Sequence, residues 1–137
     1  MSATSAAKLL ADLQARGWYL AIAESLTGGA LASEIVAVPG APNVFLGSIT
    51  AYQNSIKQNL LEVPANILQS RGAVSAETAE AMATGVRAQF AAAAGKSIDH
   101  VIGLSTTGVA GPDQDGDKPV GLVYLGLDIP GDRKSVV

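Results

Sequence analysis

The stretch WYLAIAESLTGGALASEIV, residues 18–36, decides the fold class. Residues 18–23 are an apolar run of the length expected for a buried strand. The run breaks at Glu24-Ser25, and Gly28-Gly29 then opens residues 30–36, which we expect to form a helix. The stretch therefore predicts a buried strand that passes into a helix through a turn at Ser25.

The same alternation continues along the chain. We expect helices over residues 4–16, 55–61, from 64 toward 72, and 75–93, and strands over residues 44–51, 99–106 and 120–127. Asn54 and Ser75 are candidate N-caps. Residues 131–135 look like the start of a further element, whose type the pattern leaves open. Alternating helices and strands predict an α/β domain with helices on both faces of a mostly parallel or mixed sheet.

Composition narrows the classes of function. The chain has 137 residues, 48% of them apolar and few of these aromatic, which fits one domain built of layers. Its net charge of −3, without a basic run, leaves no docking face for nucleic acid. Having no cysteine and one histidine, it offers no thiol nucleophile and no Cys-based or multi-His metal site. With no apolar run near the roughly 20 residues of a membrane span and no N-terminal signal peptide, we expect a cytoplasmic protein.

The turn at Ser25 is the first candidate site. In open α/β sheets, ligands bind where strands end and helices begin. Gly28 and Gly29 would let a ligand approach the backbone, and the helix N-terminus suits a phosphate, a carboxylate or a developing oxyanion. Ser25 and Thr27 add hydroxyl groups. A plain helix cap with a tight turn explains the same residues, and this segment alone leaves both interpretations open.

The second candidate is Tyr52-Gln53-Asn54-Ser55-Ile56-Lys57, which directly follows the next expected strand. If the two strands are parallel neighbours, this segment lies at the same sheet edge as Ser25. A lysine whose pKa is lowered can act as general base toward a serine, and Tyr52 could relay a proton or orient a substrate. A solvated helix lysine and an interface tyrosine remain the alternative.

Two loops and the histidine complete the candidates. Residues 105–112 leave a strand through hydroxyls and small side chains that could contact a small ligand, although an ordinary loop explains them equally. Residues 113–117 resemble a calcium loop, but their glycine and position twelve, Tyr124, do not fit one, so we expect a solvated acidic loop and no metal. His100 starts a strand at the end away from these loops, which predicts a structural or surface role.

Taken together, the segments resemble one family. AESLTGG (23–29), AYQN (51–54) with Lys57, GAVSAE (72–77), TGVAGP (107–112) and KPVG (118–121) are similar in order and spacing to the CinA C-terminal domain family. The resemblance covers residues from about 5 to 130. It implies a three-layer α/β/α sandwich and nicotinamide-nucleotide amidase activity. That reaction hydrolyses the carboxamide of nicotinamide mononucleotide to nicotinate mononucleotide and ammonia, without a cofactor.

The resemblance also implies roles for individual residues. Ser25 would be the nucleophile, Lys57 its base and Tyr52 a helper, with N–H groups of the Gly28-Gly29 turn stabilising the oxyanion. The implied substrate-binding residues are Thr27, Gly28, Gly29, Asn54, Thr107, Gly108, Ala110 and Gly111. A nucleotide-binding module without catalysis, or an interaction module linked to competence or DNA damage, remains the alternative function.

Two departures from the family stand out. Residues 113–117 are acidic where the family commonly carries adjacent glycines. The family also usually continues past Val137 with another helix. We therefore expect residues 1–137 to form one stand-alone amidase domain that either has lost this helix or never had it. We also expect a homo-oligomer, because closed homo-oligomers are common.

Overall fold

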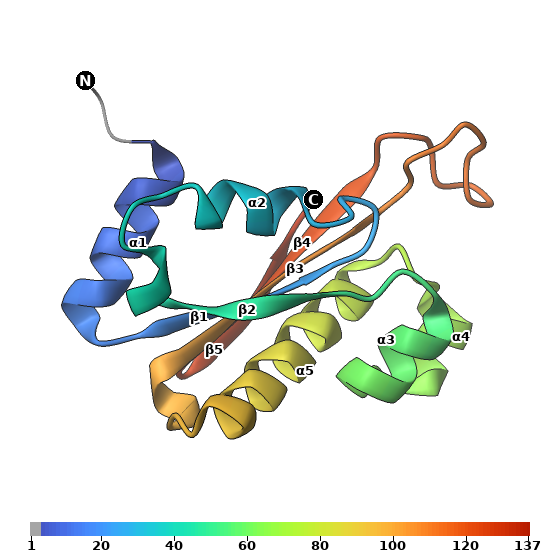
Figure 1. The fold of residues 1–137 in the computed structure, drawn as a ribbon. Coiled ribbons are helices and arrows are strands. Elements are labelled where there is room, and N and C mark those ends of the chain that lie inside the picture. Colours follow the sequence, from blue (N-terminus) through green and yellow to red (C-terminus); the bar gives the residue numbers. More distant parts are fainter. Residues whose placement is uncertain (1–3) are drawn as a thin grey trace.

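The computed structural model describes residues 4–137, an α/β fold with a five-stranded mixed sheet (Figure 1). The elements in chain order are α1 (Ser5–Arg16), β1 (Tyr19–Glu24), α2 (Ala30–Val36), the 3₁₀ turn η1 (Ala41–Asn43), β2 (Phe45–Thr50), α3 (Asn54–Leu61), α4 (Ala65–Arg71), α5 (Ala76–Ala94), the 3₁₀ turn η2 (Ile98–His100), β3 (Val101–Gly108), β4 (Val123–Ile129) and β5 (Asp132–Val136). The strand order is β2-β1-β3-β4-β5. This confirms the expected α/β class.

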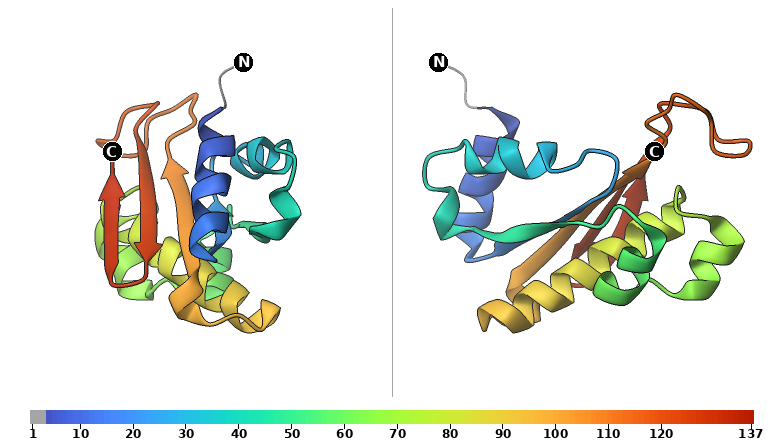
Figure 2. Two further views of the ribbon diagram at one scale, coloured as in Figure 1. Left: turned by 90° about the vertical axis from the view of Figure 1, so that its left-hand side faces the viewer. Right: turned by 45° about the vertical axis from the view of Figure 1, so that its right-hand side comes forward.

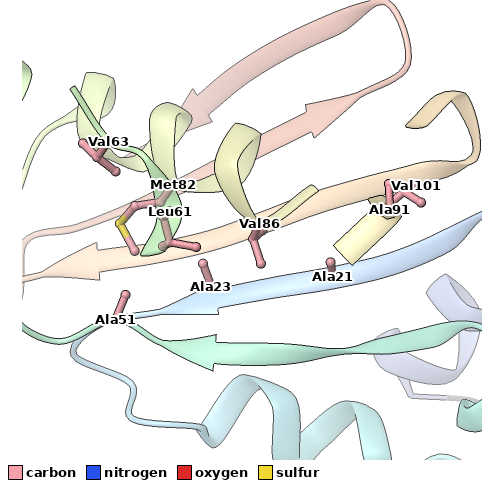
Figure 3. Close-up of a cluster of buried hydrophobic side chains, with 9 residues drawn as sticks. All are labelled: Ala21, Ala23, Ala51, Leu61, Val63, Met82, Val86, Ala91 and Val101. Carbon is pink, nitrogen blue, oxygen red and sulfur yellow. The ribbon is translucent and has the colours of Figure 1, made fainter. Parts of the chain in front are cut away.

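The helices cover both faces of the sheet, as Figure 2 shows from two sides. Side chains alternate along β1, so Leu20 and Ile22 pack against α1 and α2. Ala21 and Ala23 face the opposite layer, where they meet Met82 and Val86 of α5 and other apolar side chains (Figure 3). Two hydrophobic cores therefore hold three layers together.

The topology brings three loops to one edge of the sheet. β1 runs parallel to both β2 and β3. The segments that follow these three strands, which begin at Ser25, Ala51 and Val109, therefore leave from the same edge. This arrangement was expected from the sequence if the strands were parallel neighbours, and the structure confirms it.

Most of the expected elements are present. Ser75 is the N-cap of α5, and its side chain accepts a hydrogen bond from Thr78 N–H at 3.1 Å. The prediction that Asn54 caps its helix is wrong, because α3 begins at Asn54 and Gln53 holds the cap position without a side-chain hydrogen bond.

The C-terminal hairpin differs most from expectation. β4 begins at Val123 rather than Val120, and residues 131–135 belong to β5, which pairs antiparallel with β4. Pro130-Gly131 forms the turn between them, with a positive φ of 87° at Gly131 that favours glycine. A Pro-Gly dipeptide is itself a turn signal that could have indicated this hairpin.

The expectation that the N-terminus is not a signal peptide falls partly on residues 1–3, which lie outside the described residues. Within residues 4–137, no helix is long and apolar enough to cross a membrane.

Gly85 of α5 provides a test of how closely α3 and α5 pack. A Cβ at this position would lie 1.9 Å from the carbonyl oxygen of Leu61, the last residue of α3. Gly85→Ala gains about 1 kcal/mol of helix propensity, whereas overpacking typically costs about 1–3 kcal/mol. Because a backbone atom cannot move aside cheaply, we expect the cost to reach the upper end of this range, about 3 kcal/mol. Urea titration should therefore show a net loss of about 2 kcal/mol in unfolding free energy. Equal or greater stability of Gly85→Ala would contradict this packing.

Candidate active site

Ser25 and Lys57 meet at the edge where β1 and β2 end. Lys57 lies in α3 with its side chain buried, and its Nζ is 2.9 Å from Ser25 Oγ. Nζ also donates to the backbone carbonyls of Ala51 and Tyr52, each at 2.8 Å. Carbonyl oxygens only accept, so two of the three Nζ positions must carry hydrogens that point at them. The third position faces the serine hydroxyl.

Burial controls the protonation of Lys57. Removal from water lowers the pKa of Lys57 from 10.5 to about 8. In the described part of the chain, no carboxylate lies within salt-bridge distance to restore the charge. When Nζ is neutral, its two hydrogens stay on the carbonyls and its lone pair turns to Ser25. The arrangement can therefore accept the proton of the serine hydroxyl.

A cavity of about 280 Å³ opens above this pair. Four of the expected substrate-binding residues line it, namely Thr107, Gly108, Ala110 and Gly111. Other lining residues come from the turn after Ser25, from the segment after β2 and from the loops before α5 and after β3, namely Leu26, Tyr52, Ala73, Val74, Val109, Asp113 and Asp115. The cavity therefore joins the Ser25–Lys57 pair to the loop that follows β3.

Two residues of β3 shape the cavity wall. Thr107 is buried, and its hydroxyl donates to the carbonyl of Ala73 at 2.7 Å, so it braces the wall. A Cβ at Gly108 would lie 2.6 Å from the carbonyl oxygen of Leu122 and 3.1 Å from Leu26 Cδ1. Only glycine therefore fits at position 108 without a shift of its neighbours.

The turn after Ser25 corrects one expectation. Thr27, Gly28 and Gly29 do not line the cavity. The Gly28 N–H donates to the carbonyl of Ser25 at 3.2 Å, and the Gly29 N–H helps to lower the pKa of the Glu24 carboxyl. Because neither glycine lines the cavity and the Gly28 N–H already has an acceptor, this arrangement does not favour the oxyanion role predicted for the two N–H groups.

Glu24 fills the N-terminus of α2. Its carboxylate, fully buried, accepts hydrogen bonds from the N–H groups of Leu31 and Ala32, both at 3.0 Å, and from the Thr27 hydroxyl at 2.5 Å. Burial alone would raise the pKa of the Glu24 carboxyl, but these hydrogen bonds outweigh it and hold the pKa below its ordinary value. The sequence left a ligand site and a plain cap both open at this helix terminus, and the chain's own carboxylate occupies it.

Several other candidates lie away from the dyad or at its rim. Asn54 is exposed in the first turn of α3 and does not line the cavity. Tyr52 is 69% exposed at the rim of the cavity, while its backbone carbonyl accepts a hydrogen bond from Lys57 Nζ. His100 lies in η2, before β3 and away from the Gly108 end of that strand. Among the residues that the structure describes, no cluster of three His, Cys, Asp or Glu side chains is placed to hold a metal ion.

Comparison with known proteins agrees with the sequence resemblance. Residues 2–137 match the family model described as the CinA C-terminal domain. The chain belongs to this family. A CinA-like protein of Acaryochloris marina is 48% identical over 124 residues, which are 90% of this chain and 28% of that protein. The chain thus spans less than a third of the length of this curated relative.

Solved structures of CinA proteins share the fold. The competence damage-inducible protein A of Klebsiella pneumoniae is 31% identical with a TM-score of 0.83, covering 96% of this chain and 77% of that one. The competence/damage inducible protein CihA of Agrobacterium tumefaciens is 29% identical with a TM-score of 0.84, covering 99% of this chain and 82% of that one. The mixed-sheet architecture is therefore that of the CinA C-terminal domain.

Some groups at the centre of this CinA domain were not identified from the sequence. Glu24 was seen only as part of the turn, although an acidic residue just before a helix start is a known signal for a helix N-terminus. The carbonyls of Ala51 and Tyr52 carry no signal, because every residue has one. Asp113 and Asp115 were expected in a solvated loop, and the structure places them along the cavity.

The lowered pKa of Lys57 predicts how the stability of this CinA domain depends on pH. The unfolded chain binds a proton up to about pH 10.5, whereas the folded chain releases it above about pH 8. The penalty for burying Lys57 is therefore full below about pH 8 and disappears as the pH rises through 10.5. Relative to Lys57→Met, the wild type should gain about 2 kcal/mol of unfolding free energy between pH 7 and pH 10. A difference that does not change with pH would contradict the burial of a titrating amine.

Proposed function

We propose that this chain is a serine–lysine amidohydrolase that cleaves the carboxamide of nicotinamide mononucleotide, releasing nicotinate mononucleotide and ammonia. The proposal rests on the contact between Lys57 Nζ and Ser25 Oγ at 2.9 Å. This contact is buried, and the carbonyls of Ala51 and Tyr52 accept the other hydrogen bonds of Nζ. The choice of substrate rests on membership of the CinA C-terminal domain family. The acidic lining of the cavity by Asp113 and Asp115 suits the cationic pyridinium ring and the ribose hydroxyls of that substrate.

Acylation begins with the neutral amine of Lys57. It takes the proton of Ser25 as Oγ attacks the amide carbon, and the carbonyls of Ala51 and Tyr52 hold the resulting ammonium. The negative oxygen of the tetrahedral intermediate needs a donor other than Gly28 or Gly29. Leu26 follows the nucleophile and lines the cavity, and its N–H has no acceptor among residues 4–137. We assign it to the oxyanion, in the position that the residue after a nucleophile commonly takes.

The departure of ammonia completes acylation, and deacylation then uses the same groups with water in place of the serine. The amide nitrogen leaves as ammonia with the proton held by Lys57, and the nicotinoyl group stays on Ser25 as an ester. Lys57, neutral again, takes a proton from water as that water attacks the ester. The nicotinate product leaves and Ser25 regains its proton. Tyr52, at the rim, would contact the substrate rather than the dyad.

Removal of either dyad member tests the assignment. We expect Ser25→Ala and Lys57→Met each to lower ammonia release from nicotinamide mononucleotide by at least about 1,000-fold. Ser70→Ala and Lys8→Met, matched changes at exposed positions outside the cavity, should leave it unchanged. Near-normal release from a folded Ser25→Ala would overturn the proposal. Calorimetric binding without release by the wild type would instead favour a nucleotide-binding module.

The pH profile tests the role of Lys57 separately. Because the free enzyme is active only with neutral Lys57, kcat/KM should rise about tenfold per pH unit below the pKa and level off above about pH 8. A steady-state ammonia assay between pH 5.5 and 9.5 measures this. A profile that is flat from pH 6 to pH 9 would contradict a lysine base.

A further inference from the structure

A chain of hydrogen bonds runs from Ser25 to the buried Glu24. The backbone N–H of Ser25 donates to the Thr106 carbonyl at 3.1 Å and lies 3.4 Å from Thr106 Oγ1. Thr106 Oγ1 is 2.8 Å from Thr27 Oγ1, which donates to Glu24. A threonine hydroxyl has one hydrogen, and that of Thr27 goes to the carboxylate, so Thr106 must donate to Thr27. In this series of hydrogen bonds, every donated hydrogen therefore points away from Ser25 and toward Glu24.

The alternation of β1 separates the two neighbouring side chains. Leu20 and Ile22 face the α1–α2 layer, and Glu24, the next residue of that series, finds its partners at the start of α2. Ser25 points its hydroxyl to the other layer, where it meets Lys57 of α3. The carboxylate is thereby held away from the amine and cannot form an ion pair that would keep Lys57 charged.

We propose that Glu24 is a positioning residue, which acts through Thr27 and Thr106 to fix the turn that presents Ser25 Oγ to Lys57. Ser25 and Lys57 come from different elements, so their contact depends on where the turn lies relative to β3. The Thr27–Thr106 bond joins that turn to β3 across 79 positions of sequence. This role rests on the proposed function of the dyad but concerns a residue outside it.

A simple cap for α2 would use the same contacts, and the two roles predict different results. A cap affects how much protein is folded. A positioning residue affects the reactivity of Ser25 in protein that is fully folded, and it lowers kcat while KM stays unchanged, because the cavity lining is untouched.

Thr27 offers a matched pair of variants for the test. Thr27→Val removes the hydroxyl with little change of shape, and Thr27→Ser keeps it. Glu24→Gln replaces one accepting oxygen with an NH₂ group that cannot accept from a backbone N–H. Ser105→Ala is the control, since it removes a buried hydroxyl bond of the same strand, to the Ala79 carbonyl on the α5 face.

The readout is the rate at which a fluorophosphonate labels Ser25, followed by intact-mass measurement, beside kcat and KM for nicotinamide mononucleotide. Circular dichroism confirms that each variant is folded. We expect Thr27→Val and Glu24→Gln to lower the labelling rate and kcat by about 100-fold, the loss that a small misplacement of a reacting group causes. Thr27→Ser and Ser105→Ala should stay within about threefold of the wild type.

The two proposals fail in different ways. Labelling of Thr27→Val at the wild-type rate would overturn the positioning role and leave the dyad intact. Equal loss of activity in Thr27→Ser and Thr27→Val would also overturn it, because the hydroxyl would then not matter. If wild-type Ser25 is labelled rapidly but no ammonia is released, the proposed substrate fails while the labelling rates still decide the role of Glu24. If Glu24→Gln does not fold, the Thr27 pair decides it alone.

Discussion

The burial of one amine organises this domain. Lys57 Nζ is enclosed by the hydroxyl of Ser25 and two backbone carbonyls, and all three contacts depend on β1 and β2 ending side by side. If β2 were shifted by one residue along β1, the carbonyls of Ala51 and Tyr52 would no longer meet the amine. The register of the parallel strands therefore sets the chemistry of the site.

The burial of Lys57 has a cost in folding free energy that the rest of the fold must offset. A pKa lowered from 10.5 to about 8 corresponds to about 3 kcal/mol near neutral pH, a large share of the 5–15 kcal/mol that typically separates folded from unfolded proteins. The two hydrophobic cores supply the offset. On the α5 side the packing is close, because the backbone of α5 lies directly against glycines of the sheet. At Gly103 and Gly126, a Cβ would fall 2.1 Å from carbonyl oxygens of α5. Close packing and a buried lysine without a carboxylate partner among residues 4–137 thus occur in the same layer.

Local patterns predict the fold class and the meeting of Ser25 and Lys57 at one sheet edge, whereas the roles expected of the two residues came from the family resemblance. The apolar run before Ser25, the break after it and a second strand before Lys57 are enough to bring the two side chains to one edge. The role of the turn was not predictable in this way. The link between the turn and β3 depends on Thr106, which lies 79 residues beyond Thr27, and two interpretations of the turn were open until the backbone N–H groups were located. Asn54 was misassigned by one position, since α3 begins at Asn54 and Gln53 holds the cap position.

The central claim is that Lys57 is a buried amine that loses its proton near neutral pH. It can be measured without a substrate by following the ¹³Cε resonance of Lys57 during a pH titration of lysine-labelled protein. Lys57→Met identifies the resonance by its loss. The structure predicts a midpoint near pH 8, well below the midpoints of the exposed lysines. A midpoint near the ordinary value of 10.5 would contradict the account, because a lysine that stays charged cannot take the proton of Ser25.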